Sequence, residues 1–108
     1  MGATLPKPLD AYFGAKNTND VDRMVATFAD DATVADEGKT IRGASAIRKW
    51  IDDTNAKYRY TVDVTGVTET DGGATIACRL SGSFPGSPVD VEYEFALNDG
   101  KITRLAIN

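Results

Sequence analysis

Phe28-Ala29-Asp30-Asp31-Ala32-Thr33-Val34-Ala35-Asp36 lies where one apolar pattern changes into another. Apolar residues recur at helical spacing before this stretch, and they alternate within it as in a strand. We therefore expect a helix to end here, with Asp30-Asp31 finishing it at the surface, and a short strand to run from Thr33 to Ala35. Asp36 is left where that strand ends. A carboxylate at such a junction can reach the mouth of a pocket between helices and sheet.

Three helices are predicted around this stretch. The first should run from about Pro8 to Lys16, the second should follow the N-cap residue Asp20, and the third should span about Ala44 to Asn55. Each has an apolar face at helical spacing. The three faces consist of Leu5, Leu9, Tyr12 and Phe13, of Val21, Met24, Val25 and Phe28, and of Ile47, Trp50, Ile51 and Thr54.

Alternating patterns elsewhere predict strands joined by tight turns. Asp36-Glu37-Gly38-Lys39 should turn the chain into a second short strand from Thr40 to Arg42. Asp71-Gly72-Gly73 and Asn98-Asp99-Gly100 are hairpin signals. A long strand should start after Lys57, with Tyr58, Tyr60, Val62 and Val64 on one face, and three more should span Ala74–Ser83, Val89–Leu97 and Lys101–Ile107.

This order of elements predicts an α+β fold. Three helices followed by a meander of four antiparallel strands should place the helices on one face of a curved sheet. The 108 residues are expected to form one domain, spanning residues 1–108. The opposite face of the sheet is polar enough for water or for a polar dimer contact. It should carry Asp63, Thr75, Arg79, Glu92 and Glu94.

Composition excludes several classes of partner and site. The net charge is -4 with scattered basic residues, which argues against nucleic acid and anionic membrane surfaces. No apolar run approaches the length of a membrane span, and the first six residues lack the features of a secretory leader. The one cysteine, Cys78, lies in an alternating pattern and is expected to be buried and structural, which fits a reducing cytoplasm.

Histidine is absent, so the commonest general base and the commonest transition-metal ligand are missing. Acid–base chemistry here must use Asp, Glu, Tyr or Lys. Asp36, Glu37 and Asp63 show no spacing typical of a metal site, so we expect no metal and no cofactor. Arg48 and Arg79 could bind an anionic substrate, but exposed salt bridges are favoured for both.

Several local strings resemble the NTF2-like superfamily, particularly its SnoaL-like and ketosteroid isomerase branches. The strings are Phe28-Ala29-Asp30-Asp31-Ala32-Thr33-Val34, Ile41-Arg42-Gly43 with Ala46-Ile47-Arg48, and Asn98-Asp99-Gly100-Lys101-Ile102. The resemblance covers nearly the whole chain. It implies a cone-shaped, cystatin-like roll in which helices close over a concave sheet and enclose an apolar pocket. It does not imply one activity, because the superfamily includes isomerases, cyclases, dehydratases, hydrolases and non-catalytic binders.

The resemblance to ketosteroid isomerases implies three catalytic positions. Their general base falls on Asp36 and their oxyanion-hole tyrosine on Tyr12. The protonated acid of their oxyanion hole falls on or near Tyr93, which is a departure, and a register slip by one would present Glu92 or Glu94 instead. Removing a proton next to a carbonyl needs a base within reach and a donor for the oxygen that gains charge.

The predicted substrate-binding walls are aromatic. They are Phe13, Trp50, Tyr58, Phe84 and Phe95. The expected ligand is a small apolar or carbonyl-containing molecule, steroid-like or polyketide-like, and the expected assembly is a homodimer.

Simpler interpretations stay open for each catalytic candidate. Asp36 could be a solvated turn residue, and Tyr12 and Tyr93 could be core residues. The alternative function is a non-catalytic module that binds an apolar ligand or mediates dimerisation. A third, epoxide hydrolase-like activity would need an Asp-Arg-Asp set that the sequence does not place.

Overall fold

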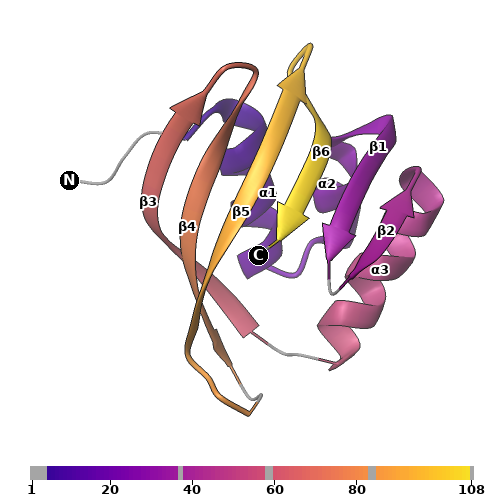
Figure 1. Cartoon of the computed structure of the whole chain (residues 1–108). Helices are drawn as coiled ribbons and strands as arrows, with labels where there is room; N and C mark the ends of the chain where they lie inside the picture. The colour runs from indigo at the N-terminus through magenta and orange to yellow at the C-terminus, as the bar shows by residue number, and fades with distance from the viewer. Residues whose placement is uncertain (1–4, 37, 58–59, 83–84, 108) are drawn as a thin grey trace.

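The computed structural model describes residues 5–36, 38–57, 60–82 and 85–107. Within these residues, two helices are followed by two strands, a third helix and four more strands (Figure 1). The elements are α1 (Lys7–Asn17), α2 (Val21–Ala26), β1 (Phe28–Asp36), β2 (Lys39–Arg42), α3 (Ala44–Lys57), β3 (Tyr60–Thr70), β4 (Gly73–Gly82), β5 (Val89–Asn98) and β6 (Lys101–Ile107). None of the helices in these ranges is long and apolar enough to cross a membrane.

The strands of the described chain form one sheet in the order β2-β1-β6-β5-β4-β3. The predicted antiparallel meander from β3 to β6 is confirmed. Its last hairpin uses Asp99 and Gly100, whose φ angles of 52° and 74° suit a tight turn between Asn98 and Lys101. β1 pairs with β6 in parallel, with Val34 beside Leu105, and this pairing was not predicted.

The boundary between α2 and β1 corrects the sequence prediction. α2 ends at Ala26, and Phe28 begins a strand that reaches Asp36, so Asp30-Asp31 lies inside a strand and not at a helix end. The reason is a long-range pairing: the backbone N–H of Ile102 in β6 donates to the Thr27 carbonyl at 2.8 Å. Phe28 still faces the core, because the helical and extended patterns both bury it. Asp30 and Asp31 are exposed, as expected.

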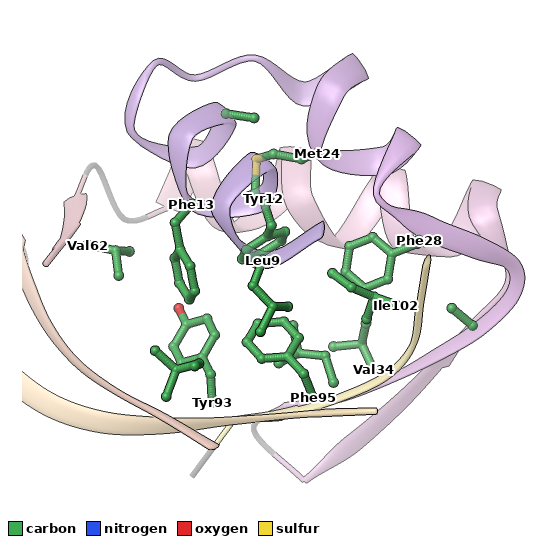
Figure 2. Packing of buried hydrophobic residues seen from close by; sticks show 14 of the residues in the cluster. Leu9, Tyr12, Phe13, Met24, Phe28, Val34, Val62, Tyr93, Phe95 and Ile102 are labelled. Atoms are coloured by element: carbon green, nitrogen blue, oxygen red, sulfur yellow. The ribbon is translucent and has the colours of Figure 1, made fainter. Parts of the chain in front are cut away.

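The core lies between the helices and one face of the curved sheet. α1 and α2 lie behind the sheet in Figure 1, and α3 lies beside β2. Figure 2 shows side chains of α1 and α2 directed toward those of the strands. The largest buried side chains include Leu9, Met24, Ile47, Ile76, Tyr93, Ile102 and Leu105. Burying a side chain of this size typically stabilises a fold by roughly 1.5–3 kcal/mol.

The outer face of the sheet is polar, as predicted. Asp63, Arg79, Glu92 and Glu94 are exposed, and Thr75 is half-buried. Arg79 makes an exposed salt bridge to Asp90 at 2.9 Å. On the helical side, Arg48 pairs with Asp22 at 2.7 Å, so the expectation of exposed salt bridges for both arginines is confirmed.

Candidate functional site

Asp36 and Trp50 are joined by a hydrogen bond. Asp36 is half-buried at the end of β1, and Trp50 Nε1 donates to its Oδ2 at 3.0 Å. The local chain explains this meeting. Gly43 follows β2 with a φ of 90°, and its N–H donates to the Ala32 carbonyl at 2.9 Å, which starts α3 close against β1. The indole N–H of Trp50 therefore holds the Asp36 carboxyl group in one orientation.

These two residues line a cleft of about 380 Å³ between β2 and α3. Its wall combines apolar groups, including Ile41 beside the indole of Trp50, with cationic side chains. One of those cations, Lys49, is bonded to Asp53 at 3.0 Å. An apolar wall with a carboxylate and nearby cations can hold an organic molecule that carries a polar group.

Four other predicted site residues form an aromatic cluster in the core (Figure 2). Tyr12 and Phe13 come from α1, and Tyr93 and Phe95 come from β5. Tyr12 and Phe95 have ring centroids 5.8 Å apart, and Phe13 and Tyr93 have centroids 5.5 Å apart. All four side chains are at most 4% exposed. They do not line the cleft that contains Asp36.

The hydroxyl groups of this cluster keep their protons at neutral pH. Burial raises the pKa of Tyr12 well above its ordinary value, and nearby Tyr60, Asp36 and Cys78 raise it further. Asp36 is thus close enough for its charge to act on Tyr12. Burial likewise raises the pKa of Tyr93, with smaller effects from Tyr12, Tyr60 and Cys78, including a hydrogen bond with Tyr60. Such phenols act as hydrogen-bond donors and not as sources of protons.

The structure thus forms two groups from the predicted residues. In the first group, Trp50 is hydrogen-bonded to Asp36. The second group is the buried aromatic cluster of Tyr12, Phe13, Tyr93 and Phe95. The charge of Asp36 acts on Tyr12 and so links the two groups. Among residues 92–94 of β5, Tyr93 is buried, whereas Glu92 and Glu94 are exposed. Tyr58 and Phe84 lie outside the described residues.

Comparison with known families identifies the family of this chain. The sequence profile of the SnoaL-like domain matches residues 9–105. The chain belongs to the SnoaL-like family. None of the curated proteins matches this SnoaL-like chain.

Solved structures agree with this assignment. A Sinorhizobium meliloti protein, provisionally named a polyketide cyclase, is 38% identical, with a TM-score of 0.93 over 96% of this chain and 95% of that one. A Catenulispora acidiphila protein with a ketosteroid isomerase-like fold, in complex with trimethylamine, is 23% identical, with a TM-score of 0.84 over 97% and 86% of the two chains. A Mycobacterium tuberculosis protein in complex with estradiol-17beta-hemisuccinate is 19% identical, with a TM-score of 0.79 over 94% and 89%. The predicted cone-shaped NTF2-like fold is confirmed.

Sequence reasoning missed a second polar group in this SnoaL-like domain. Lys16, at the end of α1, is only 5% exposed, and its Nζ donates to Asn55 Oδ1 at 2.7 Å. A signal for its burial was present in the sequence. Lys16 follows Leu9 by seven residues and Tyr12 by four, so it shares their helix face.

Metal ligands do not gather in the described part of the SnoaL-like domain. No group of three or more His, Cys, Asp or Glu side chains is placed there to hold a metal ion. Cys78 is a free, buried cysteine, as expected, and burial raises the pKa of its thiol to about 12. A thiol with this pKa is a poor nucleophile and a poor metal ligand at neutral pH.

Proposed function

We propose that this SnoaL-like domain binds a small, largely apolar molecule with a carbonyl group and transfers a proton next to that carbonyl. The observation that carries the proposal is the hydrogen bond from Trp50 to Asp36, which orients a carboxylate whose charge also raises the pKa of Tyr12. The 38% identity to a provisional polyketide cyclase supports the same class of chemistry, because such cyclisations begin at carbons activated by a carbonyl. The structural likeness to a protein bound to a steroid ester supports a ligand of similar character.

In this proposal each residue has a separate role. Asp36 takes the proton from the carbon next to the carbonyl, and Trp50 holds its carboxylate in place. Tyr12 donates a hydrogen bond to the oxygen that gains charge, and its raised pKa keeps the donated proton on the phenol. Tyr93 is the second donor, linked to Tyr60, while Phe13 and Phe95 provide apolar surface beside the hydroxyl groups.

Asp36→Asn tests the role of the base. The amide has the size of the carboxylate but cannot accept the proton, so turnover of a β,γ-unsaturated ketone should fall by at least about 10²-fold. Ligand affinity should stay nearly unchanged. The absorbance of the conjugated enone product reports turnover, and equilibrium titration reports affinity. Asp31→Asn, an exposed change in the same strand, is the matched control. Equal losses in the two variants would remove Asp36 from the mechanism.

Trp50→Phe tests the positioning of that base. Phenylalanine keeps an aromatic wall but removes the donor to Asp36. We expect kcat to fall by about tenfold or more with KM nearly constant, since a loosely held base loses orientation and not binding. A rise in KM at constant kcat would assign Trp50 to the pocket wall alone.

A second candidate function is binding without catalysis. It is favoured by the burial of Tyr12 and Tyr93, each only 2% exposed within packed aromatic rings. A protein that binds such ketones but converts none of them would support this function. Tyr12→Phe would then leave affinity unchanged, because only the hydroxyl is lost.

We also propose that the protein is a cytoplasmic homodimer. The single reduced cysteine fits a reducing compartment. The outer sheet face offers a polar surface for such a contact, with Asp63, Arg79, Glu92 and Glu94 exposed on it. A monomeric mass from light scattering at micromolar concentration would remove the dimer.

A further inference from the structure

A second cleft lies where the last turn of α1 meets β3 and β4. It has a volume of about 350 Å³, and its wall includes Lys16, Asn55, Tyr60 and Ser81. The side-chain amide of Asn17 fixes this end of α1: its Nδ2 donates to the backbone carbonyl of Val62 at 3.0 Å, and its Oδ1 accepts from the N–H of Val62 at 2.9 Å. Lys16, the residue before Asn17, is thereby held against β3.

Lys16 is a buried cation whose partners in the described structure are both uncharged. Its Nζ donates to Asn55 Oδ1 at 2.7 Å and lies 3.8 Å from the centre of the Tyr60 ring. Tyr60 is the titratable group that contacts this ammonium in the described chain, and a phenol is neutral near pH 7. Burial lowers the pKa of Lys16 to about 8, and no carboxylate of the described residues offsets this effect. A buried charge of this kind favours an anionic partner.

Asn55 contributes a donor to the same cleft. Its Oδ1 accepts the hydrogen bond from Lys16, and this fixes the orientation of the amide, because a flipped amide would set one donor against another. Its Nδ2 is then buried without a hydrogen-bond partner in the described part of the chain. Buried donors are nearly always satisfied in native proteins, so this atom points to an acceptor that the polypeptide does not provide.

We propose that this cleft binds the carboxylate of a small organic acid. One carboxylate oxygen accepts from Lys16 Nζ and the other from Asn55 Nδ2, while the carbon body lies against Tyr60. A monoanion matches the single buried cation of the described wall. A carboxylate also has two oxygens to meet two neighbouring donors. Asp36 does not line this cleft, so its carboxylate takes no part in the proposed binding.

Benzoate and benzamide test the site, because they share a shape and differ in charge. Benzoate should bind to the whole protein at least about tenfold more tightly than benzamide, since charge-assisted hydrogen bonds are the stronger ones. Bound benzoate should also raise the pKa of Lys16, followed by NMR of its Nζ. Lys16→Met should abolish the preference for benzoate. Lys7→Met, an exposed change at the other end of α1, should keep it.

Asn55→Asp is a second test that keeps the buried lysine. The new carboxylate would supply a partner for Lys16 within the chain, so the pKa of Lys16 should rise and benzoate binding should be lost. Asp36→Asn should leave benzoate binding unchanged even if it stops turnover. Equal binding of benzoate and benzamide, or no response of the Lys16 pKa to benzoate, would mean that the cleft holds only water and would overturn the proposal.

Discussion

Lys16 is expected to make the folded protein more stable as the pH rises from about 7.5 to about 9.5. Its pKa is lowered from 10.5 to about 8 by burial. Below pH 8 both the folded and the unfolded chain carry the proton, so the full cost of burying the ammonium is present. Between the two pKa values the folded state releases its proton first, and the unfolded state binds more protons. Stability must therefore rise with pH in this window.

The size of the effect follows from the shift. Each pKa unit corresponds to about 1.4 kcal/mol, so the whole shift is worth about 3 kcal/mol. At pH 9.5, which is roughly 1.5 units above the folded pKa, about 2 kcal/mol of this should be recovered. Lys16 is only 5% exposed as a whole residue, but it lines the second cleft, where water screens part of the burial cost, so about 2 kcal/mol is an upper value.

Urea unfolding of the wild type and of Lys16→Met measures this effect, with Trp50 fluorescence as the signal. Cys78 acts in the opposite direction, because its pKa is raised to about 12 and the unfolded thiol ionises first. Both proteins keep Cys78, so it cancels in their difference. The unfolding free energy of the wild type relative to the variant should rise by about 2 kcal/mol between pH 7.5 and 9.5. A difference that stays flat would mean that the ammonium is solvated and that the reasoning is wrong.

Three further predictions concern packing and reactivity. Gly73→Ala should lower the free energy of unfolding by about 3 kcal/mol, measured by heat or urea, because the new Cβ would collide with the Phe95 carbonyl oxygen. Gly14→Ala should raise it by about 1 kcal/mol, because the space around Gly14 is open. Similar effects of the two substitutions would contradict the close approach at Gly73. Cys78 should resist a thiol reagent at pH 8 until the protein unfolds, and rapid labelling of the native protein would show that the thiol is accessible. Asn17→Ala should destabilise by about 1–2 kcal/mol through two lost bonds to β3, and faster amide exchange in β3 would locate the loss.

Local patterns were enough to predict most of the fold. The hairpin at Asp99-Gly100 and the alternating strands depend on nearby residues, and both agree with the structure. Phe28 is a position where the local pattern predicts the wrong element. Its spacing from Val21 and Met24 fits a helix, but the pairing of β1 with β6 decides its conformation, and that pairing joins distant parts of the chain. No short window of sequence contains that information.

The candidate site was predictable only in part. Asp36 and Trp50 were selected separately, as a strand-end carboxylate and an aromatic wall, and their hydrogen bond appeared only in three dimensions. Lys16 lay on the apolar face of its helix, yet a lysine is rarely buried without a charged partner, which argued for exposure. Its amide partner Asn55 lies 39 residues away in the chain.

The central place of β6 has a consequence for biosynthesis. β6 separates β1 from β5, so it is the element that joins the β2-β1 ribbon to the β5-β4-β3 ribbon. During translation both ribbons leave the ribosome before it, each with an unpaired edge that a neighbouring nascent chain could engage. Cooperative stability should therefore arrive late, when Lys101–Ile107 emerges and inserts between them. Deleting β6 should separate the β2-β1 ribbon from the β5-β4-β3 ribbon, and each ribbon should then aggregate through its unpaired edge.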